Sequence, residues 1–393
     1  MRRPRTARRA LLYVFIVSTL ASLLLVMTPK LNGTKEHSAN IVAAQLYAHL
    51  RNDIELGAAD EDQRTDQSDV ELLPSDYDYG AEMTTSVSTT NASQATSFPG
   101  SSNDGTGANI RQTTTPSMPY CPEYTAKNAS LPVVRRVTLD QLLESNSDVL
   151  PGGEWKPGNC TARHKIALII PFRDRPQHLL DFLYTMIPLL KLQQLDFRII
   201  LSEQVGTGLF NKGKLMNAAF LVARNESVGC VVLHDVDMLP KYDSVFYGCR
   251  EQPAHLGAYV DTLKYVLFYN YLVGGAMVYS VEDFQKINGY STSFWGWGAE
   301  DDDAGQRTLA KNLTIFRYPN SAHYRYRMFK HRKRHWKVYP GKLFDRLLKE
   351  ASSRMEHDGL SSENWTVVKQ TKEQLYHHLF VDVGDAPEEW KKL

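Results

Sequence analysis

The C-terminal part of the sequence predicts an α/β domain built on a parallel β-sheet. Three apolar runs, at 165–172, 197–204 and 230–237, have the composition of buried strands. The segments between these runs show the apolar spacing of helices. Strands that alternate with helices pair in parallel through right-handed crossovers, and such sheets bind ligands beyond the carboxyl ends of their strands.

The first strand, KIALIIPF, is followed by a segment whose helical spacing is marked by Leu179, Phe182 and Met186. Pro176 suits the first turn of this helix, while Pro188 is expected to kink or end it. FRIILSEQ is the second expected strand, KGKLMNAAFLVARN the second helix, and CVVLHDVD the third strand. We therefore expect three parallel strands with two crossover helices.

The N-terminal end predicts a membrane anchor. The chain has 393 residues and a globular average composition, but its first nine residues carry five arginines and precede an uncharged apolar run at 10–27. That run is near the lower length limit of a spanning helix. A cleaved signal peptide is the alternative, but no convincing small-residue cleavage pattern precedes Pro29. We expect a cytosolic head at 1–9, a signal anchor at 10–27 and a luminal remainder.

Residues 28–120 predict a disordered luminal stalk. Ser, Thr, Asp and Gly dominate there and large apolar side chains are few, so burial cannot offset the entropy of ordering. The stretch 41–56 is an exception that is compatible with a short helix. The domain at 121–393 is long enough to bury a core.

Cysteine usage and sequons agree with a secretory-pathway location. An even number of cysteines in a luminal chain predicts disulfides, and four cysteines allow three pairings. We favour pairs that are close in sequence; free buried thiols are the alternative. The pairs would be Cys121 with Cys160 and Cys230 with Cys249. N-glycosylation sequons occur at Asn32, Asn91, Asn128, Asn159, Asn225, Asn312 and Asn364.

Charged motifs stand at the expected strand ends. PFRDR (171–175), FNKGK (210–214) and HDVD (234–237) contain arginines and lysines that suit a diphosphate, and a phenylalanine at 172 or 210 is placed to cover a base. In an extended chain Asp235 and Asp237 point the same way. Their oxygens suit Mg²⁺ or Mn²⁺ beside a nucleotide diphosphate. Solvated surface charges and a solvated loop are the alternative interpretations.

The stretch SFWGWGAEDDD places four acids, Glu300 to Asp303, after two tryptophans. Like charges side by side resist burial. A solvated acidic turn is the structural explanation for the block, and a catalytic base is the functional one.

Six motifs, in order, resemble the β-1,4-galactosyltransferase family, including its β-1,4-N-acetylgalactosaminyltransferase members. They are FRDR, FNKGKLMNAAF, HDVDMLP, YLVGGAMVYS, NGYSTSFWGWGAEDDD and RMFKH, and the likeness covers 121–347. The resemblance implies a GT-A fold, a UDP-sugar donor, Mn²⁺, inversion at the anomeric carbon and a Golgi membrane protein with a luminal catalytic domain at 121–393.

The resemblance also implies a metal site and a donor site. Asp237, Met328 and His331 match the family's metal ligands; chemistry alone does not select a soft thioether for Mn²⁺. In the alternative interpretation, Met328 packs in a core and His331 is a surface base. The implied donor-site residues are Pro171, Phe172, Arg173, Arg175, Phe210, Asn211, Lys212, Val236, Asp237, Leu272, Trp297 and His331.

On the acceptor side, Asp301 matches the family's catalytic base, which takes the proton of the acceptor hydroxyl. Trp297 resembles the tryptophan that packs on sugar, and Gly296 and Gly298 would let it swing. Asp303 is expected to be structural. The implied acceptor residues are Tyr269, Trp297, Ala299, Glu300, Asp301, Asp302, Phe344 and Leu347.

Two departures from the family bear on specificity. An arginine that often lies beside the acceptor's acetamido group is missing before Phe344, where Leu343 stands. Leu272 replaces the tyrosine usual in galactosyl-transferring relatives. Leucine leaves room for an N-acetyl group, so we favour UDP-GalNAc over UDP-Gal, with an N-acetylglucosamine-terminated glycoprotein or glycolipid as acceptor.

The basic run at 323–337 has the composition of a polyanion-binding segment. A luminal location argues against nucleic acid, so phosphates, acidic glycans or solvent are its expected partners. A lectin or partner protein on an inactive transferase scaffold is the rival function. The layout is also compatible with a homodimer or an accessory membrane partner.

Overall fold

The computed structural model describes residues 118–133, 136–330 and 340–393. The expected head, anchor and helix at 41–56 lie outside the described residues, as does the expected stalk apart from its last three residues. Within the described ranges, no helix combines the length and the apolar character needed to cross a membrane.

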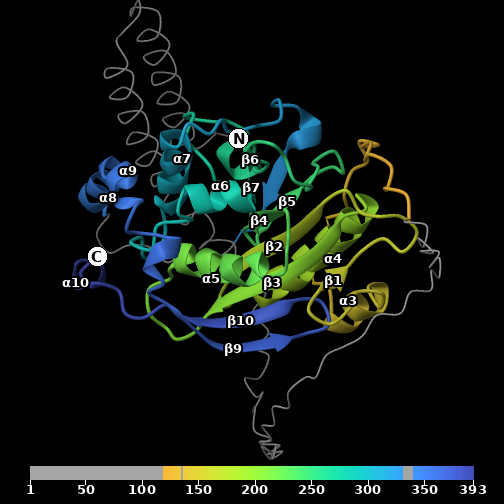
Figure 1. The fold of residues 1–393 in the computed structure, drawn as a ribbon, viewed down its shortest axis with the longest axis horizontal. Coiled ribbons are helices and arrows are strands. Elements are labelled where there is room, and N and C mark those ends of the chain that lie inside the picture. Colours follow the sequence, from red (N-terminus) through yellow and green to blue (C-terminus); the bar gives the residue numbers. More distant parts are fainter. Residues whose placement is uncertain (1–117, 134–135, 331–339) are drawn as a thin grey trace, which may run out of the picture. The chain divides into compact units, whose positions relative to one another are not determined.

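A mixed β-sheet forms the centre of the described part of the domain (Figure 1). Among the described residues this sheet has eight strands. The order is β6-β7-β4-β2-β3-β10-β9, and β1 pairs with β3. β2 pairs in parallel with both β3 and β4, as predicted, and β10 is parallel to β3. β7 runs antiparallel to β4. The strands are β1 Glu154–Trp155, β2 Lys165–Phe172, β3 Asp196–Gln204, β4 Cys230–His234, β6 Ala254–His255, β7 Ala276–Ser280, β9 Thr366–Lys372 and β10 His377–Asp382.

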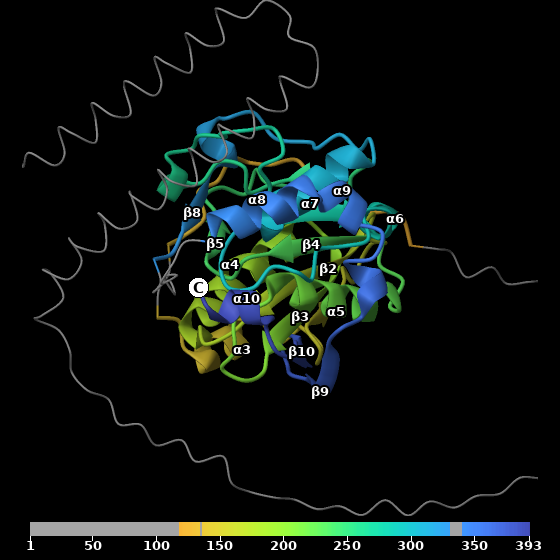
Figure 2. The same cartoon turned by 90° about the vertical axis from the view of Figure 1, so that its left-hand side faces the viewer.

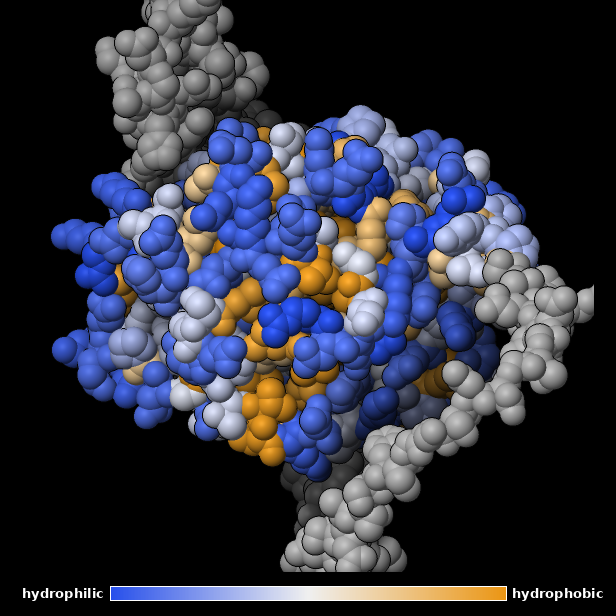
Figure 3. Space-filling model, in the orientation of Figure 1, coloured by the Kyte–Doolittle hydropathy of each residue, from blue (hydrophilic) through white to orange (hydrophobic). Residues whose placement is uncertain are grey.

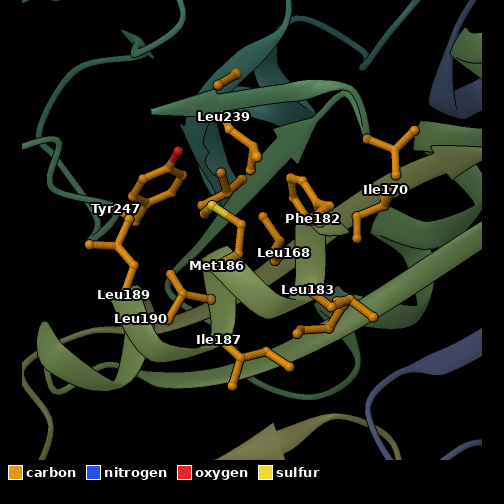
Figure 4. Close-up of a cluster of buried hydrophobic side chains, with 14 of the residues drawn as sticks. Leu168, Ile170, Phe182, Leu183, Met186, Ile187, Leu189, Leu190, Leu239 and Tyr247 are labelled. Carbon is orange, nitrogen blue, oxygen red and sulfur yellow. The ribbon is translucent and has the colours of Figure 1, made fainter. Parts of the chain in front are cut away.

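The two crossover helices cover opposite faces of the sheet because side chains alternate along a strand. Leu168 and Ile170 of β2 belong to the core beneath α4 (Pro176–Leu192), where Phe182 and Met186 point toward them (Figure 4). Ala167 and Ile169 of β2 belong to the second core, beneath α5 (Lys212–Arg224). A strand that is buried on both faces explains the uninterrupted apolar run.

Pro188 does not end α4, which continues to Leu192. Proline removes a backbone hydrogen bond and costs roughly 3 kcal/mol inside a helix. Leu189 and Leu190 in the last turn are buried in the core, and burying one such side chain contributes about 1.5–3 kcal/mol. Tertiary packing therefore outweighs the local preference on which the prediction rested.

A second layer of helices lies beside the sheet, with α7, α8 and α9 packed together (Figure 2). A two-stranded sheet of β5 and β8 lies near the end of β4. The remaining elements are α3 Leu139–Ser145, β5 Met238–Pro240, η1 Asp261–Leu263, α6 Val281–Lys286, α7 Glu300–Ala310, η2 Ala322–Tyr324, β8 Tyr326–Met328, α8 Gly341–Lys349, α9 Ala351–Arg354, η3 Leu360–Ser362 and α10 Glu388–Lys391. On the face in Figure 3 hydrophilic residues predominate, with hydrophobic ones emerging mainly in its middle and lower part.

Both predicted disulfides are present. Cys121 is bonded to Cys160, and Cys230 at the start of β4 is bonded to Cys249. They close loops of 39 and 19 residues, which restricts the unfolded chain and stabilises the fold by about 3 kcal/mol each.

Candidate active site

The acidic block forms the first turn of α7, Glu300 to Asp303. The positive end of the helix dipole and its unsatisfied N–H groups favour acids at this place. The residue before the helix, Ala299, has a φ of +70°, and Gly296 and Gly298 have φ of +81° and +108°. A positive φ at residues 296 and 298 is a backbone conformation that glycine adopts far more readily than other residues. The swing of Trp297 stays a prediction. The helix itself was not predicted from the sequence.

Lys212, the first residue of α5, joins three of the sequence motifs. Its Nζ lies 3.0 Å from Asp235 Oδ1, 3.0 Å from Asp301 Oδ2 and 3.7 Å from Glu300 Oε1. Burial disfavours the ammonium, but the carboxylates of Asp235 and Asp301 outweigh it and keep the pKa of Lys212 well above its usual range. FNKGK, HDVD and EDDD therefore meet at one buried cation.

The cluster remains rich in negative charge. Burial, together with the nearby Asp301, raises the pKa of Asp235 to about 6 and that of Glu300 to about 7, although Lys212 acts in the opposite direction. One ammonium faces three carboxyl groups. The site therefore favours a further positive charge, whether a metal ion or a sugar that becomes positively charged during reaction.

Asp301 and Asp302 have separate surroundings. The Tyr290 hydroxyl donates to Asp301 Oδ1 at 3.3 Å, and the Tyr269 hydroxyl donates to Asp302 Oδ1 at 2.7 Å. A Cβ added to Gly274, whose φ is +125°, would lie 2.6 Å from Asp301 Oδ2. The backbone thus approaches the expected base closely only because residue 274 is glycine.

The two aspartates of HDVD were expected in an extended chain, but they lie in a turn. β4 ends at His234, and a turn closes with the Met238 N–H donating to the Asp235 carbonyl. The turn sends the two carboxylates to different cations: Asp235 pairs with Lys212, and Asp237 pairs with Arg175 at 3.1 Å. The ion pair of Arg175 with Asp237 links the segment after β2 to the turn after β4.

The residues expected to bind metal are held close to one another by the β5–β8 ladder. Met238 is opposite Met328 in that ladder, and the Phe329 N–H donates to the Asp237 carbonyl at 2.8 Å. Among the described residues there is no group of three His, Cys, Asp or Glu side chains placed for a metal, and His331 lies outside them. The backbone pairing brings Asp237 and Met328 near each other, although the Asp237 carboxylate pairs with Arg175 and the Met328 sulfur accepts from the Thr262 hydroxyl at 3.6 Å. His331, three residues after Met328, would complete the expected ligand set.

Several of the expected donor-site residues lie just at or after the ends of β2 and β4, or at the start of α5. Leu272 and Trp297 belong to other loops, and His331 lies outside the described residues. Arg173 lies over the Phe210 ring, 5.2 Å from its centroid, and donates to the Gly208 carbonyl. Asn211 is fully buried; its Oδ1 accepts from the Lys214 N–H and its Nδ2 donates to the Thr292 carbonyl. Asn211 therefore caps α5 and attaches it to the segment before Trp297. Pro171 and Phe172 end β2, and Val236 is buried in the turn after β4.

The expected acceptor-side residues come from the segment before β7, the loop before α7, the first turn of α7, and α8. Phe344 and Leu347 are buried in the second core, where Phe344 packs against Phe294 and Trp390. Trp297 is 37% exposed.

Leu272 is mostly buried, and its carbonyl accepts from Arg317 at 3.0 Å. Sequence reasoning missed Arg317 and the hydroxyl of Tyr290, although NGY, which includes the tyrosine, lies within a matching motif. No local pattern marked Arg317, because its partner is 45 residues away.

Comparisons with known proteins agree with these motifs. A family described as the N-terminal region of glycosyl transferase group 7 matches residues 119–250, and one described as the N-terminal domain of galactosyltransferase matches 254–332. Human beta-1,4-galactosyltransferase 6 is 40% identical over 57% of this chain, which spans 58% of that relative's length. Human beta-1,4-galactosyltransferase 1 is 35% identical over 73% of each chain.

Two solved structures have the same fold. The catalytic domain of Drosophila beta-1,4-galactosyltransferase 7 with xylobiose has a TM-score of 0.50 and 27% identity, covering 58% of this chain and 98% of that one. A mutant of the same enzyme, in complex with manganese, UDP-Gal and xylobiose, has a TM-score of 0.51 and 26% identity, with the same coverage. With these matches and the six motifs around one acidic site, the chain belongs to the β-1,4-galactosyltransferase family.

Proposed function

We propose that the chain is an inverting, Mn²⁺-dependent glycosyltransferase that moves a sugar from a UDP-sugar to an acceptor sugar in β-1,4 linkage. The convergence of Asp235, Glu300 and Asp301 on Lys212 carries the proposal, because it places the base motif beside the strand ends where a nucleotide would bind. A similar structure holds manganese, UDP-Gal and xylobiose, which supports the same chemistry here.

In this mechanism Asp301 accepts the proton of the attacking hydroxyl. The hydroxyl oxygen bonds to the anomeric carbon from the face opposite UDP, and the bond from that carbon to the UDP oxygen breaks. Lys212 Nζ and the Tyr290 hydroxyl both donate to the carboxyl group of Asp301 and so hold it in a fixed orientation. Asp302, fixed by Tyr269, binds hydroxyls of the acceptor.

Asp237, Met328 and His331 would hold Mn²⁺, which supplies a Lewis acid for the departing diphosphate. Arg173 and Arg175 follow the end of β2 and add positive charge on the same side of the site. Arg175 also pairs with Asp237, so the protein itself supplies one cation beside this carboxylate.

The donor proposal rests on Leu272. Its loop runs between the two acidic motifs: the Asp235 N–H donates to the Gly275 carbonyl at 2.8 Å, and Gly274 lies against Asp301. We infer that the side chain at 272, near these backbone groups in the chain, lines the C2 substituent of the donor sugar. Leucine is shorter than tyrosine and leaves space for an N-acetyl group. We therefore favour UDP-GalNAc, with UDP-Gal as the alternative.

We also propose that the enzyme is a single-pass Golgi membrane protein with a luminal catalytic domain and a terminal N-acetylglucosamine acceptor. Two disulfides agree with an oxidising compartment. Removal of N-glycans from the chain expressed in cells should increase its gel mobility. An unchanged mobility would contradict the luminal assignment.

The decisive assay gives the full chain, purified in detergent, radiolabelled UDP-GalNAc or UDP-Gal with an N-acetylglucosamine acceptor. We expect Mn²⁺-dependent transfer, faster with GalNAc, that EDTA abolishes. An inactive lectin scaffold would instead bind the glycan without transferring any sugar. Transfer from UDP-Gal alone would keep the proposed reaction and overturn the donor assignment.

A further inference from the structure

A buried cluster of four charges lies behind the base helix, outside the residues assigned above to donor, acceptor or metal. It consists of Asp303 and Arg307 on α7, Arg354 at the end of α9, and Asp358; we call it the buried charge cluster. The side chains of Asp303 and Arg307 are wholly buried, and Arg307 Nε donates to Asp303 Oδ1 at 2.5 Å. Each aspartate contacts both arginines.

Asp358 holds the stem of the loop that carries Trp297. Its Oδ1 accepts from the Thr292 N–H at 2.6 Å and from the Thr292 hydroxyl at 2.8 Å, and its Oδ2 accepts from the Ser291 and Ser293 hydroxyls. Although burial favours the neutral acid, Arg307 and the Ser291 hydroxyl keep the pKa of Asp358 below its usual range. An ionised carboxylate therefore fixes the loop four to six residues before Trp297.

Arg354 extends this anchor to both neighbouring helices. Its Nη1 donates to the Ser291 hydroxyl at 2.9 Å, and its Nη2 donates to the Leu347 carbonyl at 2.9 Å and to Asp303. Leu347 belongs to the expected acceptor pocket, and Asp303 lies two residues after the base Asp301. A planar guanidinium can make these contacts together, whereas the ammonium of lysine is a single point charge.

We propose that Arg354 and Asp358 are positioning residues that hold the parts of the acceptor side in a fixed arrangement relative to one another. They join the stem of the Trp297 loop, the α8 wall of the acceptor pocket and the base helix α7 into one unit. The inference rests on the proposed transferase function. Small displacements of a base or of an acceptor wall greatly reduce the rate, because transfer requires aligned reacting atoms.

The alternative is that the cluster only stabilises the fold, as buried ion pairs do when all their partners are present. Kinetics distinguish the two roles. A positioning role predicts a selective effect on the acceptor, because Arg354 contacts Leu347, Asp303 and the loop stem but none of the residues at the β2 and β4 ends. A purely stabilising role predicts a lower melting temperature without that selectivity.

The test compares Arg354→Gln with Arg346→Gln in the full chain. Arg354 is 16% exposed and can be replaced with less disruption than Arg307, while Arg346 is a 53% exposed arginine of α8 that pairs with Glu389. We expect Arg354→Gln to raise the acceptor KM at least about fivefold and leave the UDP-sugar KM within about twofold. Arg354→Lys should restore part of the loss, and Arg346→Gln should behave as wild type.

Hydrogen exchange supplies a readout that does not depend on activity. In Arg354→Gln, amides at 291–303 should exchange at least about fivefold faster than in Arg346→Gln. Unchanged exchange, or equal increases in the donor and acceptor KM, would overturn the inference. If wild type transfers no sugar from any UDP donor, the proposed function fails, and exchange still decides whether Arg354 anchors the loop.

Discussion

The centre of the sheet and the first turn of α7 are both largely buried, but they are stabilised in opposite ways. The apolar side chains of β2 pack against those of neighbouring segments, chiefly α4 on one face and α5 on the other. The turn at 300–303 concentrates four acids. Their partners include Lys212, Arg307, Arg354 and, for Asp302, the Tyr269 hydroxyl. Burial of apolar surface is favourable by itself, whereas buried charge is tolerated only with partners.

This difference separates stability from chemistry. A defect in the apolar region should weaken folding and leave the reaction intact in molecules that remain folded. A defect in the acidic turn should weaken the reaction and change folding little where the substitution preserves shape. Substitutions in each region test that separation.

The largest effect is expected for Asp301→Asn. The amide keeps the shape of the side chain but cannot accept the hydroxyl proton, so transfer should fall by about a thousandfold or more. The melting temperature should stay within a few degrees, because one carboxylate fewer also means less repulsion against Glu300. Calorimetry should find UDP and Mn²⁺ binding nearly unchanged. Loss of UDP binding would instead place Asp301 in the donor site.

Asp237→Asn addresses the metal. Removal of a charged ligand should weaken Mn²⁺ binding by about tenfold to a hundredfold, measured by electron paramagnetic resonance of the free ion. Activity should fall with it, and folding should persist because the amide still accepts from Arg175. The matched control is Asp385→Asn, on the exposed surface. Full turnover by Asp237→Asn in EDTA would refute the metal assignment.

In the apolar region, Leu168→Ala should have the converse effect. Leu168 is fully buried in the core beneath α4, and such a truncation lowers the free energy of unfolding by about 2–5 kcal/mol. Leu192→Ala at the end of α4 is the control, since that side chain is 48% exposed. The activity per folded molecule should match wild type in both. Loss of specific activity in Leu168→Ala at low temperature would show that the regions are coupled.

The same contrast explains what the sequence could predict. The apolar run at 165–172 matches β2 in full, and the second run begins only one residue later than β3. Burial on both faces of a strand requires an uninterrupted apolar run, which is visible in the local sequence. The acidic helix could not be predicted that way. Its stability depends on Lys212, which is 89 residues from Asp301, and on Arg354, which is 51 residues from Asp303.

The site motifs themselves were identifiable by resemblance, and their convergence followed from the parallel sheet. Local detail was less predictable. The turn after β4 overrides the extended spacing of its two aspartates because the Met238 N–H bonds back to the Asp235 carbonyl. Asn211 caps α5 through a local bond, but its second bond, to the Thr292 carbonyl, joins residues that are 81 positions apart.

The smallest expected effect, and the one that sharpens the comparison most, concerns Leu272→Tyr. This residue belongs to the loop between the acidic motifs and is mostly buried. Its apolar side chain is therefore expected to affect the reaction through the shape of the donor site. We predict that tyrosine lowers the ratio of GalNAc to Gal transfer by at least about tenfold, or roughly 1.4 kcal/mol in differential barrier. The measurement uses both donors with one N-acetylglucosamine acceptor.

The direction follows from shape. An aromatic ring at this position would fill the space available to an N-acetyl group and would offer a hydroxyl to galactose, and exclusion by a rigid ring can exceed the contribution of one favourable contact. Leu272→Ile, which keeps the volume, is the control and should preserve the ratio. A wild-type preference for UDP-Gal, or a ratio that does not move in the tyrosine variant, would show that Leu272 does not select the donor. Donor choice would then depend on other residues of the acidic region.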